Sequence, residues 1–289
     1  MSDQARSLNA LPWDMRRFFL AVKTKQWRYC ESEALQHEWP ARCNSGLTVR
    51  AVYFAGMNTE KHGDGARFVP ASDQSLLIYF DNKITLRAHE QVRRMLRALE
   101  LQPIAGVRNL HPAYCSLLVN FDAVKLRHAQ LEEILRGYLG RLDEVSLPEP
   151  RLVEIPVCYG SEYGPDLNEV AALHEMTPAQ VIELHASTTY LVYFLGFVPG
   201  FAYLGELPET LVTPRLGTPR KKVPPGSVGI AGRQTGVYPF ATPGGWRLLG
   251  RTPLAMFRTD RDGLSLLSIG DRVRFAPISR ERFAEMERS

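Results

Sequence analysis

The chain has 289 residues, and 45% of them are apolar, enough to fill one large core or two medium ones. Charged residues make up 23%, and 35 basic against 31 acidic side chains leave a net charge of +4. This balance argues against a chain that is disordered throughout, a collagen-like chain and a dedicated nucleic-acid binder. The charge is uneven, because residues 199–253 alone carry seven bases and two acids. We therefore expect residues 199–253 to bind an anion.

The compartment is predicted from the cysteines and the absence of a leader pattern. The four cysteines lie far apart without a C-x-x-C pair, which favours reduced thiols. The early apolar run at 18–22 is too short for a signal peptide. Residues 186–205 carry no formal charge over a bilayer-spanning length, but Gly196 and Pro199 argue against one helix there. We expect a cytoplasmic protein without membrane contact.

Residues 1–66 differ in character from the rest of the chain. They hold three of the four tryptophans among polar residues, with no sustained helical or strand period. The pattern predicts a poorly ordered extension that the fold does not require. The spacing of Cys30, His37 and Cys43 fits no zinc pattern, so no metal site is predicted.

Regular patterns begin at residue 67 and predict an α+β domain over residues 67–160. Helical spacing of Val92, Met95 and Leu99 marks one amphipathic helix, and a second follows at 131–142. The expected strands are 76–80, 107–110, 114–121 and 151–159. Their order with the helices is strand, helix, strand, strand, helix, strand, which is the ferredoxin-like arrangement.

The second half of the chain predicts a helical connector and a barrel. Two short helices are expected within residues 161–188, one after Asp166 and one capped by Thr177. Between residues 199 and 253, 19 of 55 residues are Gly or Pro, which excludes long helices. Short strands at 189–195, 228–231, 246–249 and 269–275 indicate a compact β-barrel over residues 189–280, followed by a charged tail at 281–289.

Several common catalytic motifs are absent from the sequence. It contains no phosphate-loop motif, no G-x-G-x-x-G, no H-E-x-x-H and no G-x-S-x-G. Instead, glycine and proline crowd the loops of residues 196–253. Glycines let the backbone approach a ligand and prolines fix the loops, so the pattern favours a preorganised polar pocket. A barrel with many tight turns is the alternative on composition alone.

Three long runs carry a specific resemblance to a known family. They are FLGFVPGFAYLGEL at 194–207, TPRLGTPRKKVPPGSVGIAG at 213–232 and QTGVYPFATPGGWRLLGRTP at 234–253. These runs resemble the carboxyltransferase subdomain C/D family, whose members are called 5-oxoprolinase B subunit (PxpB), allophanate hydrolase subunit 1 or KipI-like inhibitor. The resemblance extends from about residue 67 to residue 278. It implies a small N-terminal α+β domain followed by a cyclophilin-like β-barrel.

The resemblance also implies a reaction. It points to one component of an ATP-dependent 5-oxoprolinase, which hydrolyses the lactam of 5-oxoproline to L-glutamate, with ATP and Mg²⁺ as cofactors. The implied partners are a companion carboxyltransferase subunit, like the C subunit of 5-oxoprolinase, and a lactam-utilisation subunit, like its A subunit. The chain would be active only with these partners. Its own share would be to hold anions and stabilise charge that develops on oxygen.

Candidate site residues follow from this role. The catalytic candidates are Arg220, Gln234, Tyr238 and His185, whose side chains could contact the reacting groups. The candidates for binding substrate or nucleotide are basic residues, residues with hydroxyl groups, aromatic residues that could line a pocket, and glycines whose backbone is accessible. They are Gly200, Phe201, Tyr203, Arg215, Lys221, Ser227, Thr235, Gly244, Gly245, Trp246 and Arg251. Each base could instead be a solvated surface charge, and Trp246 could belong to the core.

Two histidines and one cysteine need separate weighing. His111 precedes Pro112 at a strand turn, and His185 ends a helix that leads into the expected pocket strand. Either could act as an acid or base, and the position of His185 favours it. Cys158 lies in an apolar strand, which favours a small core residue over a reactive thiol.

Two other functions fit the same motifs. One is the carboxyltransferase half of a biotin-dependent urea amidolyase, whose pocket would receive carboxybiotin. The other is a non-catalytic, KipI-like inhibitor of a sensor histidine kinase. The residues alone do not separate these functions from that of an oxoprolinase component.

Overall fold

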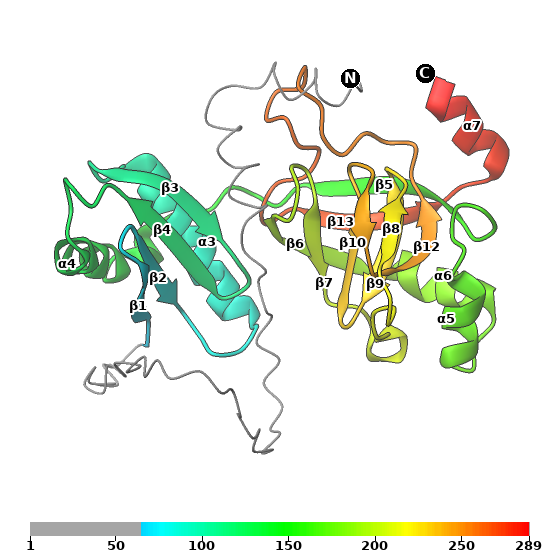
Figure 1. The fold of residues 1–289 in the computed structure, drawn as a ribbon, viewed down its shortest axis with the longest axis horizontal. Helices are drawn as coiled ribbons and strands as arrows, with labels where there is room; N and C mark the ends of the chain where they lie inside the picture. Colours follow the sequence, from blue (N-terminus) through cyan, green and yellow to red (C-terminus); the bar gives the residue numbers. More distant parts are fainter. Residues whose placement is uncertain (1–64, 289) are drawn as a thin grey trace, which may run out of the picture. The chain divides into compact units, whose positions relative to one another are not determined.

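A computed structural model describes residues 65–288 of the chain. They form a mixed α/β structure with a four-stranded sheet, a closed seven-stranded barrel and a separate two-stranded sheet (Figure 1). The prediction for the extension at residues 1–66, with Cys30, His37 and Cys43, falls outside the described residues, apart from its last two positions.

The small sheet is antiparallel, with the strand order β1-β2-β4-β3. Its strands are β1 (Arg67–Ser72), β2 (Ser75–Tyr79), β3 (Val107–Pro112) and β4 (Ser116–Phe121). Helices α3 (Leu86–Leu101) and α4 (His128–Leu139) pack on it, followed by the short 3-10 turn η1 (Leu142–Glu144). The expected periodicities are confirmed, since Val92, Met95 and Leu99 of α3 are buried. Thr85 caps α3 by accepting a hydrogen bond from the Ala88 amide.

The ferredoxin-like arrangement predicted for residues 67–160 is wrong in its last strand. The strand predicted at 151–159 exists as β5 (Leu152–Tyr159), but it pairs with β13 (Arg272–Pro277) and β12 (Arg247–Arg251) in the barrel. The fourth strand of the small sheet is β1, which forms a hairpin with β2. An apolar strand pattern marks burial without naming the neighbouring strand, which is why the sequence pattern misplaces β5.

The predicted barrel is confirmed as a closed ring in the order β10-β7-β6-β13-β5-β12-β9. The strands not yet given bounds are β6 (Thr189–Leu195), β7 (Ala202–Gly205), β9 (Ser227–Ala231) and β10 (Gln234–Val237). The short strands β8 (Arg220–Val223) and β11 (Thr242–Gly244) pair with each other outside the ring. Alternate residues such as Val228, Ile230 and Leu204 fill the barrel interior.

Helices connect and flank the barrel. The two predicted connector helices are α5 (Leu167–Leu173) and α6 (Pro178–Ser187), and Thr177 and Gln180 form the expected capping box of α6. A 3-10 turn, η2 (Glu209–Leu211), follows β7. The charged segment predicted as a tail is instead helix α7 (Arg280–Arg288), anchored by the buried side chain of Phe283.

The uncharged stretch at residues 186–205 contributes β6 and β7 to the barrel. Among residues 65–288, no helix combines the length and the apolar character needed to cross a membrane. Cys115 and Cys158 are free thiols, and Cys158 is buried on β5 as expected of a core residue.

Candidate functional site

A pair of glycines shapes the outer face of the barrel where β9 and β10 meet. Gly229 and Gly236 lie directly opposite each other in register. A Cβ atom built on Gly236 would lie 3.1 Å from Cζ3 of Trp246, and one built on Gly229 would lie 3.3 Å from its Cβ. The indole therefore occupies the space that two missing side chains leave free.

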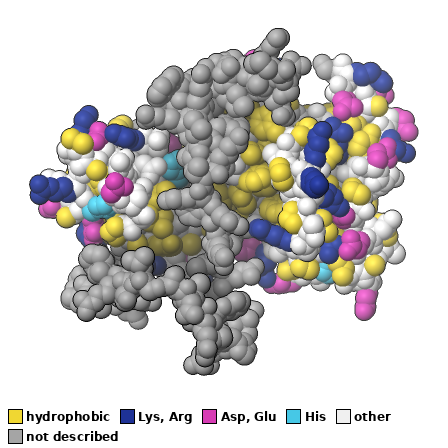
Figure 2. Space-filling view, in the orientation of Figure 1, with side chains coloured by type: hydrophobic (Ala, Val, Ile, Leu, Met, Phe, Trp, Pro, Cys, Tyr) yellow, Lys and Arg dark blue, Asp and Glu magenta, His cyan; other side chains and the backbone are white. Residues whose placement is uncertain are grey.

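Three predicted aromatic residues surround Trp246 and with it form what we call the aromatic cluster: Phe201, Tyr203, Tyr238 and Trp246. Their ring centroids lie 5.4 Å, 6.3 Å and 6.3 Å from that of Trp246, all in edge-to-face geometry. Trp246 is buried, so it packs as the core of an outer layer on the barrel. On the face seen in Figure 2, Lys and Arg side chains lie among hydrophobic side chains of this half of the chain.

Gly236→Ala should lower the free energy of unfolding by about 1–3 kcal/mol, because its Cβ would lie 3.0 Å from the Ala202 carbonyl oxygen and would push against Trp246. Gly217→Ala is the matched control, since nothing lies within 4 Å of a Cβ at Gly217. Urea denaturation followed by circular dichroism gives both values. Equal midpoints for the two variants would contradict the packing role of Gly236.

Basic side chains converge at one edge of the aromatic cluster. Arg220 on β8 lies opposite Gly244 on β11, and a Cβ on Gly244 would lie 2.5 Å from Oη of Tyr238. Arg220 also donates a hydrogen bond of 3.3 Å to the Trp246 carbonyl oxygen. Burial raises the pKa of the Tyr238 hydroxyl to about 12, while the Trp246 backbone and the charges of Arg215 and Arg220 act in the opposite direction. We call Arg215, Arg220 and the Tyr238 hydroxyl the basic edge.

A buried carboxylate fixes the position of Arg220. Asp166 Oδ1 lies 2.5 Å from Nη2 of Arg220, and Asp166 Oδ2 accepts a hydrogen bond of 2.6 Å from the Leu248 amide. Asp166 is only 5% exposed. The sequence pattern marks this residue as a helix start and gives no sign of its contact with Arg220. A buried acid can be recognised from sequence only when its partner is known, and 54 residues separate these two.

His185 lies inside the barrel, away from the basic edge. Its ring is fully buried, with Nδ1 2.8 Å from the Tyr159 hydroxyl and Nε2 2.8 Å from Thr235 Oγ1. The Thr235 hydroxyl donates its proton to the Gly229 carbonyl oxygen, so it accepts a hydrogen bond from the protonated Nε2 of His185. Nδ1 of His185 is then unprotonated and accepts a hydrogen bond from the Tyr159 hydroxyl. Burial lowers the pKa of His185 to about 3. The geometry gives His185 and Thr235 a structural role in the core.

Other predicted residues are dispersed around the barrel. Gln234 donates a hydrogen bond to the hydroxyl of Tyr114, which lies in the turn between β3 and β4. Arg251 donates to the Pro225 carbonyl oxygen over 2.8 Å and lies 5.8 Å above the ring of Phe283 in α7. Ser227 lies opposite Arg251 and is buried. These side-chain contacts of Gln234 and Arg251 lie outside the basic edge, whereas the Ser227 carbonyl oxygen accepts a hydrogen bond of 2.9 Å from the Tyr238 amide.

The remaining predicted residues lie in the loops and strand around the cluster. Gly245 packs on Pro219, with a built Cβ 3.6 Å from Pro219 Cγ. Lys221 follows Arg220 on β8 and is exposed. Gly200 has a positive φ of 80°, and a Cβ there would lie 2.7 Å from Cβ of Phe257. Gly200 therefore serves the close packing of its loop.

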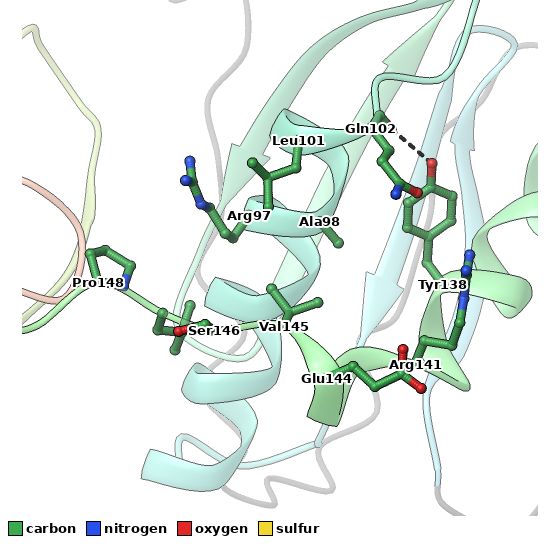
Figure 3. Close-up of a pocket in the computed structure, with 11 residues that line it drawn as sticks. Arg97, Ala98, Leu101, Gln102, Tyr138, Arg141, Glu144, Val145, Ser146 and Pro148 are labelled. Atoms are coloured by element: carbon green, nitrogen blue, oxygen red, sulfur yellow. Dashed lines mark hydrogen bonds between the residues drawn. The ribbon is translucent and has the colours of Figure 1, made fainter.

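A pocket of about 500 Å³ lies in the small domain, outside the predicted site (Figure 3). Side chains of α3, α4 and the segment after η1 line it, among them Arg97, Leu101, Tyr138 and Arg141. Tyr138 closes one side by donating a hydrogen bond of 2.7 Å to the Gln102 carbonyl oxygen. None of the residues predicted to be functional lines this pocket.

Fold and site together define a barrel protein with a preorganised cationic edge beside an aromatic cluster. Residues 66–267 match the family described as carboxyltransferase domain, subdomain C and D. The chain belongs to this family, as the motifs at 194–253 predict.

Curated relatives agree with the family match. The chain is 42% identical over 221 residues to the B subunit of 5-oxoprolinase from Bacillus subtilis, covering 73% of this chain and 92% of the relative. It is 43% identical to the protein of the same name from Escherichia coli O157:H7, and the match covers 73% of this chain and 96% of the relative. A urea amidolyase of Lachancea kluyveri is 23% identical, and the match covers 14% of that protein.

Solved structures give the same fold. A crystal structure of a protein named TTHA0988 matches with a TM-score of 0.64 and 36% identity, over 71% of this chain and 40% of that one. This chain thus spans less than half the length of that protein. The urea carboxylase of Kluyveromyces lactis matches with a TM-score of 0.61 at 19% identity, over 76% of this chain and 22% of that one, which supports the fold alone.

Proposed function

We propose that the chain is one component of an ATP-dependent 5-oxoprolinase, which hydrolyses 5-oxoproline to L-glutamate together with partner subunits. The identity of 42% and 43% to proteins named as the B subunit of 5-oxoprolinase, over 92% and 96% of their lengths, supports this function. The urea amidolyase alternative has weaker support, since those relatives are 22–23% identical. An ATP-dependent reaction also fits the cytoplasmic location that the sequence predicts.

The observation that carries the proposal is the convergence of Arg215, Arg220 and the Tyr238 hydroxyl at the basic edge. A lactam carbonyl is a poor electrophile. Transfer of the γ-phosphoryl group of ATP to the amide oxygen would activate the ring carbon and release ADP. Water then adds to that carbon, the C–N bond breaks, and glutamate and inorganic phosphate leave. Two guanidinium groups and a phenol are suited to holding the negative charge of the phosphoryl group during these steps.

The residues also fit the phosphate part of a nucleotide. Lys221 is exposed next to Arg220 and could contact a further phosphate oxygen. Within residues 65–288, no three His, Cys, Asp or Glu side chains group as metal ligands. Mg²⁺ is commonly held by substrate phosphates and water with one or two carboxylates, so the nucleotide would bring it. Biotin would enter only under the urea amidolyase alternative.

The partners are part of the proposal. We infer a complex with a protein like the C subunit of 5-oxoprolinase, formed through the barrel, and with a protein like its A subunit. The purified chain alone should release no glutamate from 5-oxoproline and ATP, because no nucleotide-binding motif is present in its sequence. Adding the two companion proteins should restore glutamate release, measured by a coupled glutamate assay.

The same preparation distinguishes the alternatives. Urea-dependent carboxyl transfer with biotin carrier protein, in the absence of oxoprolinase activity, would establish the amidolyase function instead. Inhibition of a sensor kinase without any turnover in the reconstituted complex would establish the inhibitor function. Glutamate release by the chain alone would contradict the requirement for partners.

A further inference from the structure

Helix α3 carries two basic side chains toward the outer face of the barrel. His89 and Arg93 are four residues apart and so share one face of the helix. The His89 ring lies 4.8 Å from that of Tyr193 on β6, in edge-to-face geometry. A Cβ built on Gly270 would overlap Cζ of Arg93, so this guanidinium rests on the backbone just before β13. The residues therefore form a seam between α3, β6 and β13.

Arg272 joins the seam from the barrel side. It lies opposite Leu191 in the antiparallel pair of β13 and β6, and opposite residues share one face of a sheet. Leu191 and Tyr193 cluster with Tyr114 outside the barrel core. Arg272 thus projects from the outer face, as Tyr193 does. We call His89, Arg93, Tyr193 and Arg272 the α3 seam.

The α3 seam carries an excess of positive charge. Burial lowers the pKa of the Arg93 guanidinium and the positive charge of Arg272 acts in the same direction, while the charges of Glu90 and Asp271 raise it. The neighbouring carboxylates are each engaged by another arginine, in the pairs Asp271–Arg151, Glu90–Arg94 and Glu206–Arg233. Within residues 65–288, neither Arg93 nor Arg272 has a carboxylate oxygen within 4.0 Å. Two guanidinium groups therefore lie near each other, and the carboxylates closest to Arg93, those of Glu90 and Asp271, are paired with other arginines.

His89 is buried at the inner end of the seam with its hydrogen-bonding capacity unused. It is 2% exposed, and neither ring nitrogen has a hydrogen-bond partner within the described part of the chain. Burial and the charges of Arg93 and Arg272 lower its pKa to about 4, and the Tyr114 backbone acts in the opposite direction. The imidazole is thus neutral at pH 7 and has one N–H to donate. Buried polar groups without a partner are uncommon and point to a missing ligand.

We propose that the α3 seam is a second anion-binding site, separate from the basic edge, which holds a small oxyanion between the guanidinium groups of Arg93 and Arg272. The shared chemistry is that of phosphate and carboxylate, whose oxygens accept paired N–H donors of arginine. The N–H of His89 supplies a third donor from the buried end. A bound anion joins α3 to β13 and so stabilises the packing of the small sheet on the barrel.

Thermal unfolding of the full chain tests the site with inorganic phosphate as the probe. At constant ionic strength set with chloride, increasing phosphate should raise the Tm of the wild type until it saturates. Arg272→Gln should raise the half-saturating concentration at least about tenfold, which equals about 1.4 kcal/mol of binding free energy. Arg274→Gln is the matched control, because Arg274 lies on the same strand and pairs with Glu154. It should respond as the wild type does. Acetate in place of phosphate shows whether a carboxylate is also accepted.

Two further measurements separate this site from the basic edge. Arg220→Ala should keep the saturable increase of Tm with phosphate. If Arg220→Ala loses this increase while Arg272→Gln keeps it, the anion binds at the basic edge and the proposal is overturned. The ring signal of His89 in a histidine-selective ¹³C NMR spectrum, assigned with His89→Gln, should shift with phosphate in the wild type and not in Arg272→Gln. A wild type without saturation, or an equal response in every variant, would also overturn the proposal.

Discussion

Arg220→Ala should lower glutamate release by the reconstituted complex by about two to four orders of magnitude. This is the loss expected when one preorganised cation that stabilises transition-state charge is removed. The structure supports the expectation, because Asp166 and the Trp246 carbonyl hold this guanidinium beside the Tyr238 hydroxyl. The assay is ATP-dependent glutamate release at saturating 5-oxoproline.

The ion pair with Asp166 makes a stability control necessary. Removing Arg220 leaves a buried carboxylate without its partner, which costs about 1–3 kcal/mol of stability. The double variant Arg220→Ala/Asp166→Asn removes that charge, so it should regain stability while staying inactive. Arg258→Ala, which breaks an exposed pair with Asp260, should leave turnover unchanged. An active, stable Arg220→Ala variant would remove this residue from the site.

The chain should lose stability steeply as pH falls below about 6.5, the ordinary histidine pKa. The folded pKa of His185 is lowered to about 3 and that of His89 to about 4, both mainly by burial. The unfolded chain therefore binds these protons between pH 6.5 and pH 4 while the folded chain does not, and stability rises with pH in this window. Each histidine contributes about 1.4 kcal/mol per pH unit there.

His185→Gln tests this linkage. The amide can still donate to Thr235 and accept from Tyr159, but it does not titrate, so the slope of unfolding free energy against pH should fall by roughly 1.4 kcal/mol per unit. Thr235→Val is the matched control, since it removes the hydroxyl partner and leaves the imidazole. It should lower stability at all pH values and keep the slope. Urea titrations from pH 5 to pH 7.5 give both quantities, and an unchanged slope in His185→Gln would contradict the assignment.

The small domain shows what local patterns can and cannot predict. The spacing of Val92, Met95 and Leu99 and the Thr177–Gln180 capping box depend on neighbouring residues, and both predictions are confirmed. The partner of β5 depends on residues 272–277, about 120 positions away, and no local pattern encodes it. The sequence pattern at 281–289 predicts a tail rather than α7 because the one residue that anchors the helix, Phe283, stands among charges.

The predicted site residues also show the difference between local patterns and long-range contacts. Gly244, Trp246, Tyr238 and Arg220 are candidates because they lie within one dense run of motifs, and the structure places them close together; their role in a site stays a prediction. Gln234 and Thr235 are adjacent in that run, but successive residues of a strand point to opposite faces. Gln234 therefore reaches Tyr114 outside the barrel, whereas Thr235 meets His185 within it.

The pairing of β13 between β5 and β6 bears on how the chain can be shortened for experiments. The family match ends at residue 267, before β13 begins at Arg272. A fragment cut at that boundary would keep β5 and β6 but lose the strand that joins them, which would open the ring and expose two strand edges to intermolecular pairing. The same geometry sets the timing of folding on the ribosome. Closure must wait until residues 272–277 have emerged, whereas the small sheet, complete at residue 121, can form much earlier.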